Sequence, residues 1–209
     1  MTCIILVRHG ETDWNREEHF RGRADVPLNE TGLLQAEATG RRIAAEWRPS
    51  AVYASPLSRS LRTAEAIARH FDLTVQAHAG LMDIDYGQWQ GLTPSEVRKR
   101  WPEMADAWYH APQRAQIPGG ETLEEVRARA LAAVHEMAAR HAGQTLVLVS
   151  HTVVNRVILG GTGSGHRALL APAAGHVRRE RVRSGRQSLH LDVAERNVPP
   201  ALRSCTRMK

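Results

Sequence analysis

Histidine and arginine side chains stand at the ends of apolar segments that have the length of β-strands. Arg8 and His9 end the first such segment, Arg59 lies a few residues beyond the second, and His151 directly follows a later one. Guanidinium groups bind the oxygens of phosphate or carboxylate groups in pairs, and a neighbouring histidine can attack phosphorus. Because these positive groups would repel one another without an anion between them, the pattern favours a phosphate pocket.

A loop rich in Asp, Gly and aromatic residues, 81–91, carries two further candidates. Asp83 and Asp85 follow another predicted strand, and a carboxylic acid beside a phosphate can protonate the departing oxygen. Both Asp83 and Asp85 are candidates for this acid.

The elements that must position these side chains alternate along the chain. Strands are predicted at residues 3–7, 51–54, 73–77 and 145–150. Helices are predicted at residues 33–47, 59–71 and 153–159, and after the capping boxes that begin at Thr93 and Thr122. Such alternation is typical of an α/β fold with a parallel sheet, in which ligands bind beyond the carboxyl ends of the strands. The candidate side chains are therefore expected to meet at one edge of the sheet.

A series of motifs over residues 3–160 resembles the histidine phosphatase superfamily, the phosphoglycerate-mutase-like enzymes. The motifs lie in the order and spacing of that family: Leu6-Val7-Arg8-His9-Gly10-Glu11-Thr12 with Trp14-Asn15, Asp25–Gly32, Ser55-Pro56-Leu57-Ser58-Arg59, Asp83–Gly91, Pro118-Gly119-Gly120-Glu121 and Val149-Ser150-His151. The resemblance implies a three-layer α/β/α sandwich with a mostly parallel sheet.

The resemblance also implies roles for individual residues. His9 would be the nucleophile that forms a phosphohistidine. Arg8, Arg59 and His151 would complete the cationic pocket, with Asn15 as an added donor to the substrate. Asp83 stands where the family usually has a glutamate as proton donor, so the resemblance makes Asp83 the first candidate for the acid and Asp85 the second. The carboxyl group of Asp83 is one methylene closer to the backbone than that of a glutamate.

The function implied is a metal-independent phosphomonoesterase, a hydrolase that acts on a small phosphorylated metabolite. The loop 86–91 and the short chain resemble the phosphatase branch. Two alternatives remain open: a phosphoglycerate mutase, which returns the phosphoryl group to its substrate, and a non-catalytic relative that only binds phosphorylated ligands. No cofactor is expected, and no metal site, since the remaining histidines do not show the spacing of metal ligands.

Composition changes near residue 165, which suggests a catalytic domain at 1–165 and an atypical tail at 166–209. The formal net charge is +6. Residues 1–165 hold 18 basic and 19 acidic residues, whereas residues 166–209 hold 10 basic and 3 acidic residues. All ten aromatic residues lie between Trp14 and Tyr109. The tail has few large apolar groups to bury. The hypothesis is that it is divergent, poorly ordered or read in a shifted frame relative to related proteins.

The sequence also bears on partners and location. Because the near-neutral body carries the candidate site, the basic balance is no argument for nucleic acid as a partner. No apolar run approaches the ~18 residues of a membrane span, so no membrane is expected and a cytoplasmic location is predicted. A homodimer is left open.

Overall fold

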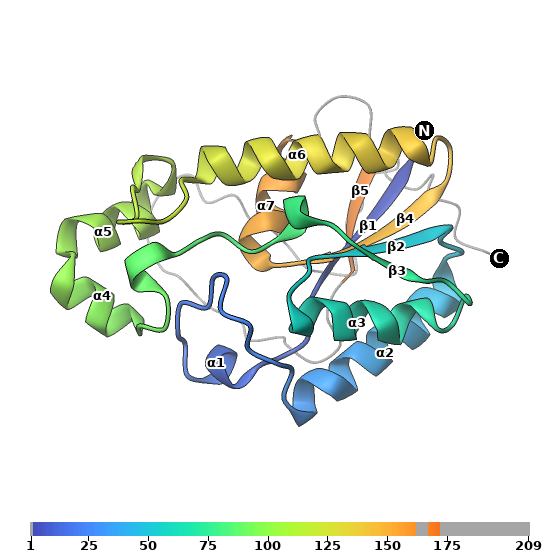
Figure 1. The fold of residues 1–209 in the computed structure, drawn as a ribbon, viewed down its shortest axis with the longest axis horizontal. Coiled ribbons are helices and arrows are strands. Elements are labelled where there is room, and N and C mark those ends of the chain that lie inside the picture. The colour runs from blue at the N-terminus through green and yellow to red at the C-terminus, as the bar shows by residue number, and fades with distance from the viewer. Residues whose placement is uncertain (1, 162–166, 172–209) are drawn as a thin grey trace, which may run out of the picture.

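The computed structural model describes residues 2–161 and 167–171 as an α/β fold (Figure 1). The strands are β1 (Cys3–Arg8), β2 (Ala51–Ala54), β3 (Val75–Ala77), β4 (Thr145–Ser150) and β5 (Arg167–Ala171). The α-helices are α1 (Asp13–Arg16), α2 (Glu30–Glu46), α3 (Ser58–Ala68), α4 (Pro94–Arg100), α5 (Pro102–His110), α6 (Leu123–Arg140) and α7 (Thr152–Gly161). Short 3-10 turns cover Ala79–Leu81, Gly87–Trp89 and Pro112–Arg114. No helix in these described ranges is long and apolar enough to cross a membrane.

The strands form one sheet in the order β3-β2-β4-β1-β5, and every neighbouring pair is parallel. The carboxyl ends of the strands therefore share one edge, as the sequence predicted. β4 lies between β1 and β2, which brings residues about 140 positions apart into register, with Arg8 opposite Ser150. The three segments that end in candidate site residues are thus neighbours in space.

β5 was not predicted from the sequence. It pairs with β1 from Cys3 opposite Arg167 to Val7 opposite Ala171. The sheet therefore takes in residues from the segment that was expected to be a separate tail. Residues 162–166 and 172–209 lie outside the described residues, so the predicted disorder of the tail stays a prediction.

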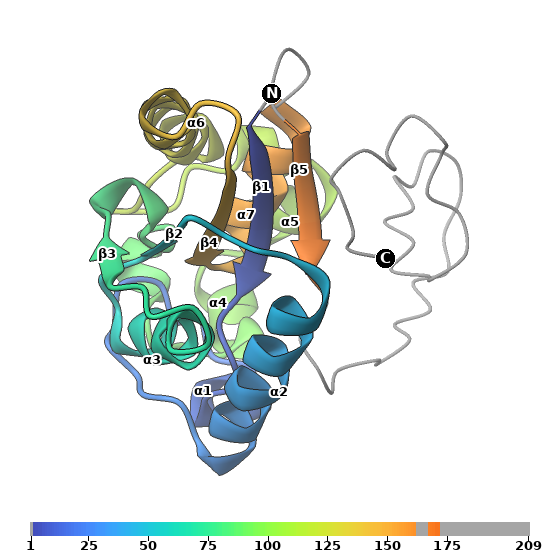
Figure 2. The same cartoon turned by 90° about the vertical axis from the view of Figure 1, so that its right-hand side faces the viewer.

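Side chains of alternate direction divide the core into two layers. Ile4, Leu6 and Leu148 pack on one face with apolar residues of α6 and α7, whereas Ile5 and Val149 pack on the other with residues of α2 and α3. Figures 1 and 2 show the sheet between these two pairs of helices. Because both faces are covered, the strands read as continuous apolar runs. The three-layer α/β/α sandwich is confirmed.

The predicted helices form close to their expected residues. Both capping boxes are present, at Thr93 and Thr122. Helix α3 begins at Ser58, whose backbone N–H donates to Asp25 Oδ1 at 2.8 Å. On α2, the Leu34 side chain is 71% exposed.

Helices α4 and α5 form an excursion beyond the sheet edge (Figure 1). Trp101 and Trp108 pack against the core on the α6 side of the sheet. The Trp108 ring meets Tyr86 and Trp89 edge-on, with ring centroids 5.6 and 6.2 Å away. This excursion therefore helps to hold the loop that carries Asp83.

Candidate active site

His9 follows β1 directly, and hydrogen bonds from two other elements fix its backbone. Its N–H donates to the carbonyl of Ser150 at 3.1 Å, and the next N–H, of Gly10, donates to Thr63 Oγ1 at 3.1 Å. The imidazole is only 3% exposed. β4 and α3 therefore hold the histidine in place at the sheet edge.

The hydrogen bond of the His9 ring determines which nitrogen carries the proton. Nδ1 lies 2.6 Å from the Gly10 carbonyl oxygen, which can only accept, so Nδ1 carries the hydrogen. Burial lowers the pKa of His9 well below its usual value, and the charges of Arg59 and Arg8 lower it further. At neutral pH the ring is uncharged and Nε2 has a lone pair, which is the state of a nucleophile.

Arg59 lies in the first turn of α3 and is completely buried. Its Nη1 donates to the Ala24 carbonyl at 2.7 Å, and its Nη2 donates to the Gly22 carbonyl at 2.8 Å. Gly22 has a φ of 52°, a conformation that glycine adopts without the cost a side chain would bring. These contacts fix the orientation of the guanidinium. The group stays charged, although burial lowers its pKa.

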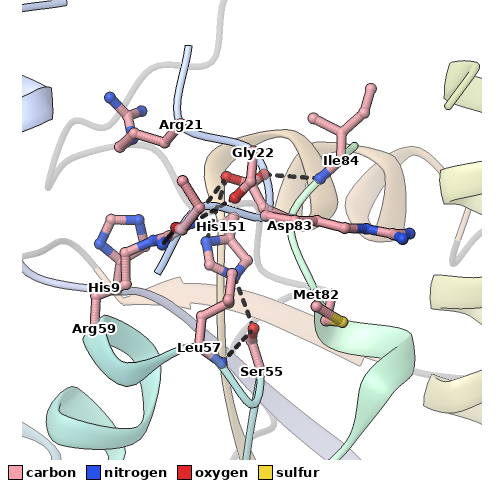
Figure 3. Close-up of polar contacts among 12 residues, drawn as sticks. His9, Arg21, Gly22, Ser55, Leu57, Arg59, Met82, Asp83, Ile84 and His151 are labelled. Atoms are coloured by element: carbon pink, nitrogen blue, oxygen red, sulfur yellow. Dashed lines mark hydrogen bonds and ion pairs between the residues drawn. The ribbon is translucent and has the colours of Figure 1, made fainter. Parts of the chain in front are cut away.

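The Asp83 carboxyl group reaches the same pocket. Its Oδ2 lies 3.5 Å from Arg59 Nη2 and 3.5 Å from His151 Nδ1, and its Oδ1 accepts the Ile84 N–H at 3.0 Å (Figure 3). Burial raises its pKa to about 6, against the opposing effect of the arginines. A carboxyl group with this pKa exchanges protons near neutral pH, as a general acid must.

Asp85 has different partners. Its Oδ1 accepts the Gly87 N–H at 2.8 Å, and its Oδ2 lies 3.4 Å from Arg23 Nη1. Both oxygens therefore serve the turn and an ion pair of the loop. Of the two candidate acids, the structure brings Asp83 to Arg59 and His151.

His151 directly follows β4 and is 1% exposed. Its Nε2 is hydrogen-bonded to Ser55 Oγ at 2.9 Å, and its ring centroid lies 5.1 Å from that of His9. Burial lowers the pKa of His151 well below its usual value, and the His9 and Arg59 charges contribute in the same direction. The ring is therefore neutral when no anion is bound, which reduces repulsion among the cations.

Two predicted ligand donors lie nearer the rim. Arg8, the last residue of β1, is half-buried, and burial lowers the pKa of its guanidinium. The Asn15 side-chain oxygen accepts from Thr12 N and Thr12 Oγ1, at 3.0 and 2.9 Å. That oxygen is part of the capping box of α1, in which Thr12 is the N-cap. The NH2 group of the same amide can only donate. A role in substrate binding is thus compatible with the cap.

Arg21 is a further cation near the pocket that was not predicted from the sequence. Its Nη1 donates to the carbonyls of Trp14 and His19, at 3.2 and 3.3 Å. Figure 3 shows its side chain above the His9 ring, and its charge lowers the pKa of both His9 and Asp83. Arg21 follows no strand, and only the Gly-containing loop in which it lies hinted at a place near the pocket.

The assembled site has three arginines and one carboxyl group around two neutral histidines. This excess of positive charge suits a phosphate dianion, and the neutral His9 can attack it. In residues 2–161 and 167–171, no group of three or more His, Cys, Asp and Glu side chains is arranged to hold a metal ion.

Comparison with known proteins identifies the family. Residues 4–171 match the histidine phosphatase superfamily (branch 1). The chain is 36% identical over 158 residues to phosphoserine phosphatase 1 of Hydrogenobacter thermophilus, covering 76% of this chain and 74% of that one. It is 38% identical over 160 residues to the metal-independent phosphoserine phosphatase of Arabidopsis thaliana, covering 76% and 67%.

A solved structure extends the comparison. The structure of YhfR from Bacillus stearothermophilus superposes with a TM-score of 0.73 at 35% identity, over 77% of this chain and 79% of that one. The phosphoglycerate-mutase-like fold expected from the motifs is thereby confirmed. The chain belongs to branch 1 of the histidine phosphatase superfamily, and it is a phosphatase that acts on phosphomonoesters.

Proposed function

We propose that this phosphatase hydrolyses small phosphorylated metabolites through a phosphohistidine formed at His9 Nε2. The hydrogen bond between His9 Nδ1 and the Gly10 carbonyl carries the proposal, because it leaves a lone pair on Nε2 of a neutral, buried ring. The same bond stabilises the positive charge that develops on the ring when Nε2 bonds to phosphorus.

In the first step, His9 Nε2 attacks phosphorus and the ester P–O bond breaks. The Asp83 carboxyl group gives its proton to the departing oxygen, so the product leaves as an alcohol. Arg8 and Arg59 neutralise the charge on the phosphoryl oxygens, while His151 and the Asn15 NH2 group supply further hydrogen bonds.

In the second step, the ionised Asp83 removes a proton from water, and the water oxygen attacks phosphorus. The P–N bond breaks, inorganic phosphate forms, and His9 regains its lone pair. Asp83 ends protonated, ready for the next ester. A carboxyl group with a pKa near 6 can act in both directions at neutral pH.

The substrate class follows from the acid and from the relatives. An aliphatic alcohol is a poor leaving group, so its phosphate ester benefits most from a buried proton donor. Two relatives are named phosphoserine phosphatases. We therefore propose phosphoserine, or a phosphomonoester of similar size, as the substrate. The predicted cytoplasmic location and the homodimer left open stay predictions.

The first prediction tests the nucleophile and the acid together. His9→Ala is expected to abolish both turnover and the trapped phosphoenzyme. Asp83→Asn is expected to lower kcat for phosphoserine by about 100-fold or more, but kcat for p-nitrophenyl phosphate much less, because its leaving group needs no proton. His70→Ala, an exposed histidine of the α3 side, is the control and should keep full activity.

Other outcomes would distinguish the alternatives. Transfer of the phosphoryl group back to substrate, with little release of phosphate, would identify a mutase. Binding of phosphoserine without any phosphoenzyme would identify a non-catalytic relative. Equal losses on both substrates in Asp83→Asn would contradict the role of Asp83 as the acid.

A further inference from the structure

We propose that Arg129 is a positioning residue that sets the Asp83 carboxyl group for proton transfer. The inference depends on the proposed function, in which Asp83 is the acid. Arg129 lies in α6, far along the sequence from the three arginines of the pocket. Its guanidinium reaches the backbone of the Asp83 loop.

The guanidinium of Arg129 binds three carbonyl groups of that loop. Nη1 donates to the carbonyls of Gly80 and Met82, at 3.1 and 2.8 Å, and Nη2 donates to the carbonyl of Asp83 at 3.0 Å. Residues 80–83 otherwise form only a short 3-10 turn and an extended stretch. Ser150 Oγ donates to the remaining carbonyl of this stretch, that of Leu81, at 2.7 Å. Arg129 therefore binds three of the four carbonyls that lead up to and include Asp83.

Glu121 fixes the guanidinium in turn and extends the support beyond Asp83. Its Oε1 accepts from Arg129 Nε at 2.8 Å, and its Oε2 accepts from Arg129 Nη2 at 2.9 Å. The same Oε2 accepts the Asp85 N–H at 2.9 Å, and the Glu121 N–H donates to the Asp85 carbonyl at 2.9 Å. The pair Arg129–Glu121 thus holds the chain before and after Asp83.

The same pair is connected to the loop that orients Arg59. Arg23 Nη2 lies 3.1 Å from Glu121 Oε1, and its neighbours Gly22 and Ala24 present their carbonyls to Arg59. Figure 3 shows Gly22 beside the Asp83 carboxyl group. Arg129 itself contacts only the Asp83 loop and Glu121, so its own bonds position the acid, and the link to the Arg59 loop runs through Glu121 and Arg23.

Lysine cannot replace Arg129 in this role. The planar guanidinium presents five N–H groups in a fixed geometry, whereas an ammonium group is a point charge with three donors. Arg129→Lys keeps the charge next to Glu121 but cannot serve three carbonyls and a bidentate carboxylate at once. The Asp83 loop would then move, and displacements of about 1 Å lower catalytic rates by roughly 100-fold.

The experiment compares Arg129→Lys with Arg127→Lys, both in wild-type enzyme and in the Asp83→Asn variant. Arg127 lies on the same helix but pairs with Glu124 at 3.3 Å in solvent, so its replacement is the matched control. For Arg129→Lys, kcat for phosphoserine should fall by about 10-fold or more, while its KM and the kcat for p-nitrophenyl phosphate stay nearly unchanged. In the Asp83→Asn background the same substitution should cause no further loss.

Two results would overturn the inference: an equal loss on both substrates, or a loss that persists in the Asp83→Asn background. If Arg129→Lys fails to fold, as circular dichroism would show, Arg129→Gln takes its place, with the same pattern expected. If Asp83→Asn itself does not discriminate between the two leaving groups, the acid role fails and this inference with it. If Asp83→Asn discriminates and Arg129→Lys does not, only the role of Arg129 is wrong.

Discussion

Asp83 and Asp85 are two positions apart, yet their carboxyl groups have different environments. Asp83 is buried between Arg59 and His151, and the loss of water raises its pKa to about 6. Asp85 is engaged by Gly87 N–H and by Arg23 at the surface of the loop. Since an acid in catalysis must exchange protons near working pH, the environment of Asp83 fits the role. The Asp83 side chain is one methylene shorter than that of a glutamate. It still reaches Arg59 and His151, because its backbone is held close to the pocket.

The pH dependence of hydrolysis follows from this carboxyl group. Because Asp83 must be protonated in the first step, kcat for phosphoserine should fall as pH rises through about 6. The Arg21 charge lowers the pKa of Asp83, so Arg21→Gln should raise that pKa and move the fall in kcat to higher pH. A pH profile of kcat measures it, with Arg16→Gln, an exposed arginine of α1, as the control. A fall that moves to lower pH would contradict this electrostatic role of Arg21.

At the level of elements, the loop after β1 is held against the first turn of α2. The Asn29 N–H donates to the Glu11 carbonyl at 3.0 Å, and the Glu11 N–H donates to Gln35 Oε1 at 2.9 Å. A Cβ atom on Gly32 would lie 2.0 Å from the Glu11 carbonyl oxygen. Such an approach is possible only for glycine, so this residue determines how closely α2 packs against the loop that begins with His9.

Gly32→Ala is therefore expected to displace the His9 loop. Overpacking of this kind costs about 1–3 kcal/mol of unfolding free energy, and kcat should fall because His9 moves. Gly160→Ala is the control: a Cβ there meets no atom of the described residues within 4 Å. Urea unfolding and phosphatase assays measure the two effects. Gly32→Ala with unchanged stability and kcat would show that the loop can adapt.

The whole molecule is stabilised by two apolar layers on the two faces of one sheet. Met137 of α6 is fully buried in the layer that also contains Leu6 and Leu148. Arg129 lies on the same helix. The packing of α6 therefore supports both the core and the Asp83 loop. Stability and catalysis are therefore linked through this helix.

Met137→Ala is expected to lower the unfolding free energy by about 2–5 kcal/mol, as large-to-small changes in cores do. Leu34→Ala should change it by no more than about 0.5 kcal/mol, because Leu34 is exposed on α2. Urea unfolding of both variants provides the comparison. A large loss from Leu34→Ala would mean that this exposed side chain is covered in solution.

Much of the fold was predictable because its elements are local patterns. The apolar runs of β1, β2 and β4 and the capping boxes at Thr93 and Thr122 are readable from neighbouring residues alone. β5 was missed because a short segment in a basic, aromatic-free region has no strong pattern of its own. It becomes a strand by pairing with β1.

The sequence by itself determined the type of chemistry: a histidine, two arginines and a second histidine after strands of a parallel sheet indicate phosphate, and the motifs indicate the family. Only the tertiary structure distinguished Asp83 from Asp85, brought Arg21 to the pocket and connected Arg129 to the acid. The physical reason is that residue type and spacing determine which groups are present at the sheet edge. Burial, pKa and orientation depend on contacts between segments distant in sequence, and those contacts exist only in the folded chain.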